Sequence, residues 1–386
     1  MENFEFYVPT KIMFGRGQLD NLPKVINEYG TRVLLVYGGE SIKKLGIYDQ
    51  INQSLDNCEI IELSGIAPNP RIDQVRTGVS LCRDKKVDVI LAVGGGSVID
   101  TAKAIAAGYY YDGDAWDMIA SQAEISKALP IVTVLTIAAT GSEANFGAVI
   151  SNPETNEKLG LNSNELFPKV SIMDPEYTFT VSKKQTAAGS IDILSHLMEQ
   201  YFVPSSTYLD DLLVESVMKA VVKYGPIAYQ QPDDYEARGQ LMWASTIADN
   251  GTLCNGNQLV AFSCHGIEHE LSAYYDITHG IGLGIVTPRW MEYILSEETA
   301  PKFARFGREV FGVAGEDDLE SAQLAIQAYR NFCQSLGTPS SLAEMGIEAD
   351  HLDEMAEHAV KAEGLDYAWV PLSAEDVKAI YEKYLA

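Results

Sequence analysis

The segment DVILAVGGGSVIDTAKAIA, residues 88–106, decides the fold of the first half of the chain. A run of aliphatic residues, typical of a buried strand, leads into Gly94, Gly95, Gly96 and Ser97, after which apolar residues recur at helical spacing. Without Cβ atoms the glycines let backbone N–H groups approach an anion, which the positive end of the helix dipole also favours. The segment therefore predicts a strand, a phosphate-binding turn and a helix. Alternatively, the glycines bind no phosphate and only permit a tight turn between the strand and the helix.

Similar patterns surround this segment in the first 181 residues. Short β-branched and aliphatic runs predict strands at 32–37, 59–63, 88–93 and 131–135, and apolar residues three or four apart predict a helix at 73–85. Strands that alternate with helices indicate a parallel sheet, in which ligands bind at the carboxyl ends of the strands. We therefore expect a Rossmann-like α/β nucleotide-binding domain at residues 1–181.

The remainder of the chain, from Ser182 onward, reads as a succession of amphipathic helices without strand-like alternation. The segments SKKQ at 182–185 and SAED at 373–376 have the pattern of capping boxes, which begin helices. The sequence thus predicts a second, all-α domain at 182–386. We expect a small-molecule site in a cleft between the two domains, where such sites are common.

Composition and charge exclude several classes of partner. The chain has 386 residues with 54 Asp and Glu against 28 Lys and Arg, a formal net charge of −26, which repels nucleic acid and anionic membranes. No apolar run has the roughly 20 residues that would span a bilayer, and the N-terminus lacks the pattern of a secretory signal. The five cysteines contain no C-x-x-C pair. We expect a cytoplasmic protein that acts on a small molecule.

A second glycine pair, Gly38 and Gly39, follows the predicted strand at 32–37, and Glu40 follows the pair. We expect this turn to lie beside the adenosine ribose of a dinucleotide. An acid near this position can accept from both ribose hydroxyls and repels a 2′-phosphate, which favours NAD over NADP. Alternatively, Glu40 is a solvated residue that the dipole of its helix stabilises.

Four of the six histidines lie between residues 196 and 279, and their spacing suggests a metal site. Asp192 and His196 are four apart on one helix face, and His265 and His269 repeat this spacing before His279. Imidazoles with one carboxylate suit Fe²⁺ or Zn²⁺ and leave a position for a substrate oxygen. A single histidine would more often be a core or surface residue, but the clustering favours a site.

One competing motif lies in the same region. Residues 265–269, HGIEH, match the H-x-x-E-H pattern of inverted zinc peptidases. That interpretation would leave Asp192 and His196 without a role, and it gives no task to the glycine-rich turn. The two other histidines, His351 and His358, lie in an acidic stretch that is typical of a solvated face.

Several ordered motifs extend over essentially the whole chain: GGGSVIDTAK at 94–103, ATGSE at 139–143, Asp192-x-x-x-His196, His265-x-x-x-His269 and YDITHG at 275–280. Together they resemble the iron-dependent alcohol dehydrogenase family. The segments FGRG at 14–17, YGG at 37–39 and PNP at 68–70 are most similar to its bacterial NAD(P)H-dependent butanol dehydrogenase branch. Glu40 departs from the glycine- and serine-containing loop that is common there.

The resemblance implies a dehydroquinate synthase-like fold and hydride transfer between a nicotinamide and a short-chain primary alcohol or aldehyde. By motif match, Asp192, His196, His265 and His279 would hold Fe²⁺, or alternatively Zn²⁺, and His269 would be the catalytic residue that helps to transfer a proton. Taken with the turn at 38–40 discussed above, the candidate cofactor-binding residues are Gly38, Gly39, Glu40, Gly94, Gly95, Gly96, Ser97, Asp100, Thr136, Thr140, Ser142 and Lys158. Family resemblance also suggests a homodimer.

A metal-dependent lyase or cyclase related to dehydroquinate synthase is the alternative function, because it would share the fold, the nucleotide turn and a metal. Such enzymes need basic groups for a phosphorylated substrate. The segments that carry the candidate ligands, 191–201 and 263–280, contain no Lys or Arg. This absence favours a neutral aldehyde or alcohol.

Overall fold

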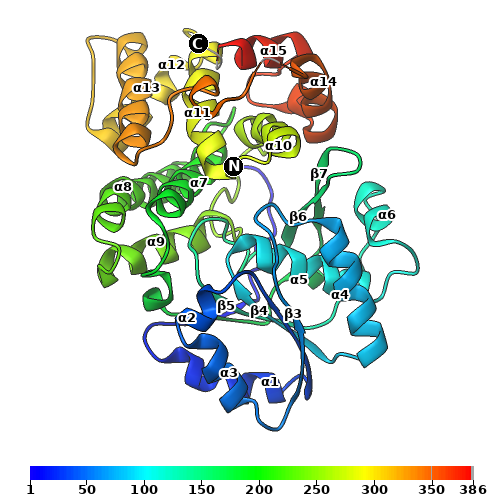
Figure 1. Ribbon diagram of the computed structural model, residues 1–386. Coiled ribbons are helices and arrows are strands. Elements are labelled where there is room, and N and C mark those ends of the chain that lie inside the picture. The colour runs from blue at the N-terminus through cyan, green and yellow to red at the C-terminus, as the bar shows by residue number, and fades with distance from the viewer. Residues whose placement is uncertain (349, 384–386) are drawn as a thin grey trace. The chain divides into compact units, whose positions relative to one another are not determined.

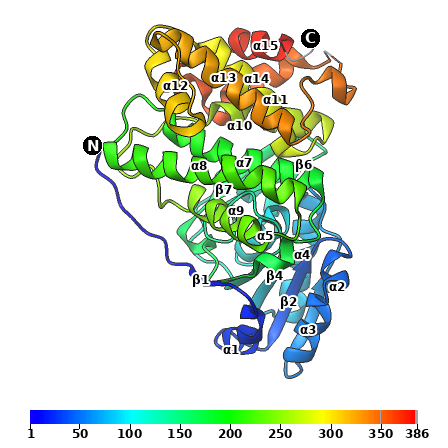
Figure 2. The same cartoon turned by 90° about the vertical axis from the view of Figure 1, so that its left-hand side faces the viewer.

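The computed structural model describes residues 1–348 and 350–383, and the chain divides into two compact units (Figure 1, Figure 2). One unit is Tyr7–Val181, and the other is Ser182–Ala386 together with Met1–Phe6. The division therefore differs from the expected one at the first six residues. They lie with the helical unit because, for example, the N–H of Glu2 donates to the carbonyl of Gly256 at 2.8 Å.

The unit Tyr7–Val181 is built on a six-stranded sheet in the order β1-β8-β5-β4-β2-β3, with every neighbouring pair parallel. Its strands are β1 (Lys11–Phe14), β2 (Arg32–Tyr37), β3 (Glu59–Leu63), β4 (Val89–Gly94), β5 (Ile131–Leu135) and β8 (Val170–Met173). The central strands are buried on both faces, which explains their continuous aliphatic sequences. The predicted Rossmann-like α/β fold is confirmed.

Helices cover both faces of this sheet (Figure 1). Alternate residues of the strands pack with one set of helices, α1 (Leu22–Asn27), α2 (Ser41–Lys44) and α3 (Ile47–Ser54), and with η1 (Gln18–Asn21). The other set is α4 (Ile72–Lys85), α5 (Gly96–Gly108) and α6 (Ala115–Ala120). Gly78 on α4 lets Ile105 of α5 approach, since a Cβ there would lie 2.2 Å from its Cδ1.

A two-stranded antiparallel hairpin, β6 (Gly147–Asn152) and β7 (Glu157–Asn162), precedes β8. The sequence did not predict this hairpin or strands β1 and β8. Two short 3₁₀ helices, η2 (Asn164–Leu166) and η3 (Pro175–Thr178), complete the unit.

The described part of residues 182–383 is helical and contains no strand, as predicted. Its helices are α7 (Lys183–Tyr201), α8 (Tyr208–Gln230), α9 (Tyr235–Ala248), α10 (Ser263–Tyr275), α11 (His279–Ile294), α12 (Ala300–Phe306), η4 (Gly307–Phe311), α13 (Asp318–Ser335), η5 (Ala343–Met345), α14 (Leu352–Glu363), η6 (Leu365–Tyr367) and α15 (Ala374–Glu382). None of the helices described here combines the length and the apolar character needed to cross a membrane.

Helix α7 is the central element of this unit, because its residues are buried from Thr186 to its last residue. It contacts α8, α9, α10 and α11. Ser182 begins the helix by accepting the N–H of Gln185 on its hydroxyl at 3.2 Å. Ser373 and Asp376 form the complete capping box that the sequence predicted for the last helix.

Candidate functional site

The first two candidate metal ligands lie on the buried helix α7. Asp192 and His196 are one turn apart and therefore share a face of the helix. The Nδ1 atom of His196 lies 3.9 Å from the Oδ1 atom of Asp192, and only 10% and 4% of their side chains are exposed. The carboxylate and the imidazole are thus held out of water in the core of the helical unit.

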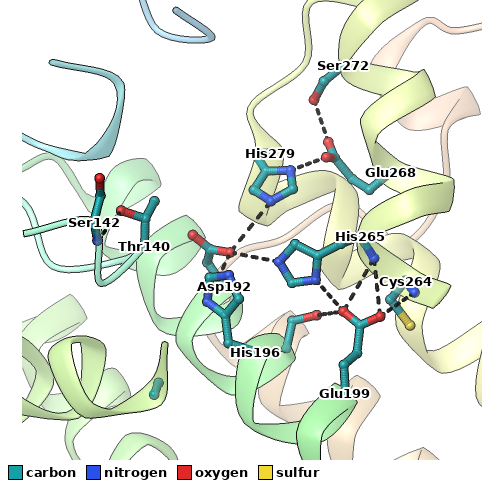
Figure 3. A network of polar contacts seen from close by, with 12 residues as sticks. Thr140, Ser142, Asp192, His196, Glu199, Cys264, His265, Glu268, Ser272 and His279 are labelled. Carbon is teal, nitrogen blue, oxygen red and sulfur yellow. Dashed lines mark hydrogen bonds and ion pairs between the residues drawn. The ribbon is translucent and has the colours of Figure 1, made fainter. Parts of the chain in front are cut away.

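Two further imidazoles reach the same carboxylate from α10 and α11. The Nε2 atoms of His265 and of His279, the first residue of α11, each lie 3.6 Å from Oδ1 of Asp192 (Figure 3). One ligand atom from each of these three residues lies within 4.8 Å of the others. The ring of His196 stacks on that of His265 with centroids 4.5 Å apart. The structure therefore brings together all four residues that the sequence singled out as metal ligands.

The unpaired atoms of this cluster fit a metal ion. In the described part of the chain, Oδ1 of Asp192, Nδ1 of His196 and Nε2 of His265 are buried without a hydrogen-bond partner. Buried polar atoms are normally paired, so three together call for a ligand. A separation of 3.6 Å is too long for a hydrogen bond. It suits two ligands of one ion, because tetrahedral bonds of about 2.1 Å place neighbouring donors about 3.4 Å apart.

The electrostatics of the cluster also favour a cation. Burial raises the pKa of Asp192, but the neighbouring imidazoles outweigh burial and hold this pKa well below its usual range. Burial lowers the pKa of His265, whereas Glu199 and Asp192 raise it, to about 10 overall. Both shifts arise because carboxylates and imidazoles face each other with little water between them.

Two glutamates orient the imidazoles, and the sequence analysis missed both of them. Nδ1 of His265 pairs with Glu199, and Nδ1 of His279 pairs with Glu268. An ionised carboxylate can only accept, so each Nδ1 carries a proton, and in the neutral ring, the form that binds a metal, Nε2 keeps its lone pair for a ligand. This arrangement is typical of metal-binding histidines, which usually donate from their second nitrogen to a carboxylate.

Each glutamate is itself held in place by hydrogen bonds. Glu199 accepts the backbone N–H of Cys264 at 2.6 Å, and Glu268 accepts the hydroxyl of Ser272 at 2.6 Å (Figure 3). Helical spacing gives a signal for Glu199, which follows His196 by three residues on the same face of α7. Glu268 is the acid of the H-x-x-E-H match, and its contact with His279 gives it a positioning role instead of the general-base role of a peptidase.

Close packing between α7 and α11 sets the position of His279. A Cβ on Gly280 would lie 2.0 Å from the carbonyl oxygen of Ala188 on α7. Gly282 leaves room for Glu268, since a Cβ there would lie 2.6 Å from its Oε1. The glycines after His279 thus allow α11 to approach both helices that carry the other ligands.

His269, the candidate catalytic residue, lies beside this cluster on α10. Its ring centroid is 5.4 Å from that of His279, and its Nδ1 lies 2.8 Å from Oε1 of Glu363. His269 is not part of the group of three ligand atoms. The two histidines to which the sequence gave no role pair with acids of their own, His351 with Glu354 and His358 with Glu270.

The candidate cofactor residues gather at one end of the sheet in the unit Tyr7–Val181. Gly38 and Gly39 follow β2, Gly94 to Ser97 join β4 to α5, and Thr136 follows β5. These three strands are neighbours, and the chain reverses its direction of crossover between β2 and β4. Nucleotides bind at such a switch point in parallel sheets.

The glycines of this turn have a packing role, which agrees with the alternative that they permit a tight turn. A Cβ on Gly96 would lie 2.5 Å from Oγ1 of Thr140, and a Cβ on Gly95 would lie 3.1 Å from Cβ of Ile137. Gly95 precedes the first turn of α5, no side chain caps this end of the helix, and the N–H groups of Val98 and Ile99 donate to the carbonyl of Gly95. The turn therefore brings the loop after β5 against the start of α5.

Asp100, Ser142 and Thr140 form a connected group beside this turn. The hydroxyl of Ser142 donates to Oδ1 of Asp100 at 2.6 Å, and the N–H of Ser142 donates to Oγ1 of Thr140 at 3.2 Å. Oδ2 of Asp100 accepts the N–H of Val149 on β6 at 3.1 Å. Lys158 is buried on β7, the other strand of the same hairpin. Asp100 thus ties α5 to the hairpin.

Glu40 lies on the surface, with 69% of its side chain exposed, and its Oε1 accepts from Nζ of Lys43 at 3.1 Å. It ends the loop that follows β2, immediately before α2. An exposed carboxylate at this place is accessible to a ligand. Because a surface ion pair of this kind is weak, Glu40 can exchange Lys43 for a ligand as its hydrogen-bond partner.

Family models match both units of the chain: one for iron-containing alcohol dehydrogenase at residues 9–175 and one for the C-terminal part of the Fe-containing alcohol dehydrogenase family at 186–385. The chain is 51% identical to NADH-dependent butanol dehydrogenase A of Clostridium acetobutylicum, over 99% of this chain and 100% of that protein. It is 35% identical to the NADPH-dependent aldehyde reductase YqhD of Escherichia coli, over 99% of both. The crystal structure of NADH-dependent butanol dehydrogenase A from Thermotoga maritima superposes with a TM-score of 0.95 at 42% identity, covering 100% of this chain and 99% of that one. The chain belongs to the iron-containing alcohol dehydrogenase family.

Proposed function

We propose that this protein interconverts short-chain aldehydes, such as butyraldehyde, and primary alcohols, with a nicotinamide cofactor as hydride donor and acceptor. The observation that carries the proposal is the cluster of buried, unpaired ligand atoms on Asp192, His196 and His265. The relatives named as butanol dehydrogenases and aldehyde reductase support the substrate class. Together they favour a redox reaction of a small neutral carbonyl compound.

Asp192, His196, His265 and His279 are the proposed ligands of a divalent cation. Fe²⁺ fits the family, and Zn²⁺ accepts the same set of three imidazoles and one carboxylate. Such an ion supplies Lewis-acid polarisation of the carbonyl oxygen. The chain itself contributes the orientation of the imidazoles, since Glu199 fixes the ring of His265 by a hydrogen bond.

The glycine turns after β2 and β4 are the proposed site of the dinucleotide. Gly94 to Ser97 would hold the pyrophosphate at the start of α5, where no side chain caps the helix and the positive end of its dipole favours an anion. Glu40 would accept from the hydroxyls of the adenosine ribose. We propose NAD as the preferred cofactor, because the carboxylate of Glu40 would repel a 2′-phosphate.

A comparison of cofactors tests the proposal. Purified protein loaded with Fe²⁺ or with Zn²⁺ should oxidise NADH faster than NADPH when butyraldehyde is added, and a chelator should abolish both rates. Absence of turnover with a folded, metal-loaded protein and several aldehydes would refute the proposed activity.

Replacement of Glu40 tests the cofactor preference separately. Glu40→Ser should shift the ratio of the NADH and NADPH rates toward NADPH on the order of tenfold, since hydrogen bonds to a charged group contribute about 1.5–3 kcal/mol. Asp49→Ser is the matched control, because it removes the same charge from an exposed position on the neighbouring helix α3. An equal shift in both variants would mean that only the net charge matters.

A further inference from the structure

The ring of His269 pairs with a carboxylate that comes from a distant part of the chain. Nδ1 of His269 on α10 lies 2.8 Å from Oε1 of Glu363, the last residue of α14. Because an ionised carboxylate has no proton to donate, Nδ1 must be the nitrogen that carries the hydrogen. In the neutral ring, Nε2 then keeps its lone pair.

The end of α14 is built so that Glu363 reaches α10. Gly364 follows it with a φ of +66°, a left-handed conformation that ends the helix, and Leu365 beyond it is fully buried. On α10, a Cβ on Gly266 would lie 2.8 Å from Cβ of Glu363 and 3.0 Å from Cδ2 of Leu365. Gly266 is therefore the residue that allows the close approach.

The pair is also shielded from water. Only 12% of the His269 side chain and 26% of the Glu363 side chain are exposed. A charge-assisted hydrogen bond is stronger in such surroundings than on the surface, because water competes less for both partners. The bond can therefore hold the ring in one orientation.

We propose that Glu363 is a positioning residue for His269, which it keeps in the Nδ1–H form so that Nε2 is the atom that exchanges a proton during the reaction. This inference rests on the proposed function. In aldehyde reduction the doubly protonated ring gives its Nε2 proton to the substrate oxygen, and the N–H electron pair stays on Nε2. The ring that remains is the neutral Nδ1–H form, which Glu363 already binds. Alcohol oxidation reverses this transfer.

A second pair supplies an internal control. Nδ1 of His358 on α14 lies 2.7 Å from Oε1 of Glu270 on α10, so the same two helices are joined twice by an imidazole and a carboxylate. Only the pair that contains His269 includes a ring beside the candidate metal ligands. A role that merely holds α14 against α10 would be shared by both pairs.

Steady-state kinetics with NADH and butyraldehyde test the inference. Glu363→Met fills a similar volume but offers no carboxylate, and we expect it to lower kcat about ten- to a hundredfold, the usual cost of removing the carboxylate partner of a functional imidazole. KM and the metal content should change little. Glu363→Gln should recover part of kcat, since its amide oxygen can still accept. His358→Ala should leave kcat close to that of the wild type.

A double-mutant cycle separates positioning from general support of the fold. If Glu363 acts through His269, Glu363→Met should cause almost no further loss of kcat in a His269→Ala background. An additive loss, or an equal loss in His358→Ala, would overturn the inference. An unchanged kcat in Glu363→Met or in His269→Ala would do the same.

Nuclear magnetic resonance of the ring nitrogens provides a readout that does not depend on turnover. The chain has only six histidines, so ¹⁵N-histidine labelling of the zinc-loaded protein gives few signals, and His269→Ala identifies the relevant ones. We expect the neutral ring of His269 to be in the Nδ1–H form in the wild type and to shift toward the Nε2–H form in Glu363→Met. The same form in both proteins would overturn the inference. Failure of the proposed function would instead appear as a wild-type protein without aldehyde-dependent oxidation of NADH.

Discussion

Gly280 is the residue on which the position of His279 most directly depends, and Gly280→Ala tests this dependence. The new Cβ would lie 2.0 Å from the carbonyl oxygen of Ala188 and 2.6 Å from its carbonyl carbon. Ordinary contact begins at 3.4 Å, so α7 and α11 would have to separate locally by about 1.4 Å. Because backbone atoms cannot rotate away, we expect the clash to lower the free energy of unfolding by about 3 kcal/mol, near the upper end of the usual range for overpacking.

Part of this cost is offset, because alanine favours a helix over glycine by about 1 kcal/mol. The net loss of about 2 kcal/mol should lower Tm by about 4–8 °C in a unit of this size. Ala188 lies one turn before Asp192 on α7, so the displacement should also move the ligands apart. We expect the affinity for Zn²⁺ to fall at least about tenfold. Calorimetry and titration of the stripped protein against a chromophoric chelator measure the two effects.

Gly284→Ala is the matched control for this experiment. It makes the same change one turn further along α11, where a Cβ would meet only side-chain atoms, Cγ2 of Thr338 at 3.0 Å and Cδ1 of Ile191 at 3.2 Å. These side chains can yield by the few tenths of an ångström required, so Tm and Zn²⁺ affinity should stay close to the wild type. Wild-type Zn²⁺ affinity and Tm in Gly280→Ala would refute the reasoning that helix packing positions His279.

Two further predictions concern carboxylates. Glu268→Gln should weaken Zn²⁺ binding about tenfold while leaving the protein folded, because a neutral amide accepts the Nδ1–H of His279 more weakly than a carboxylate does and its NH₂ can donate to the opposite tautomer. Equilibrium dialysis measures this, and unchanged affinity would contradict the role of the pair. The Arg32 guanidinium holds the pKa of Asp88 below its ordinary value of 3.8, so the pair stabilises the fold fully above that value and less as the pH falls through the lowered pKa. Asp88→Asn should therefore reduce the free energy of unfolding at neutral pH, and this difference should disappear as the pH falls below the lowered pKa of Asp88, as urea titrations at several pH values would reveal. A difference that is independent of pH would exclude the ion pair as its cause.

Three central strands of the sheet could be predicted because they are buried on both faces. The strands β2, β4 and β5 appeared as largely aliphatic runs, and the edge strand β3 as the short β-branched run EIIEL. The bounds of all four in the structure differ from the predicted ones by at most one residue. The strands β1 and β8 could not be found this way, because each has only four residues, and β1 also lies at the edge of the sheet. The hairpin β6–β7 contains glycine and asparagine in its strands, which weaken the strand pattern.

The clustering of the candidate metal ligands was predictable because they follow local rules, whereas the carboxylate partner of His269 was not. Helical spacing connects Asp192 with His196, and a short turn connects α10 with His279. Glu363 carries no such signal: it lies 94 residues from His269, and only the packing of α14 on α10 brings the two together. Sequence spacing can therefore indicate which residues bind a ligand. The groups that fix the tautomers of the imidazole rings are brought to them by tertiary contacts.

The carboxylates around the imidazoles bear on which metal such a site would select. Glu199 and Glu268 each accept from an Nδ1 atom, which raises the basicity of the opposite nitrogen without offering an oxygen ligand of their own. Mg²⁺ and Ca²⁺ require shells of oxygen atoms, and this cluster directs only the carboxylate of Asp192 at the centre. Fe²⁺ and Zn²⁺ accept imidazole readily. The buried glutamates thus supply negative charge that stabilises a dication, while their engagement with histidine keeps the donor set rich in nitrogen. A chain that presented the same glutamates directly to the ion would favour harder cations, so the imidazole between each glutamate and the centre is what suits this site to a transition metal.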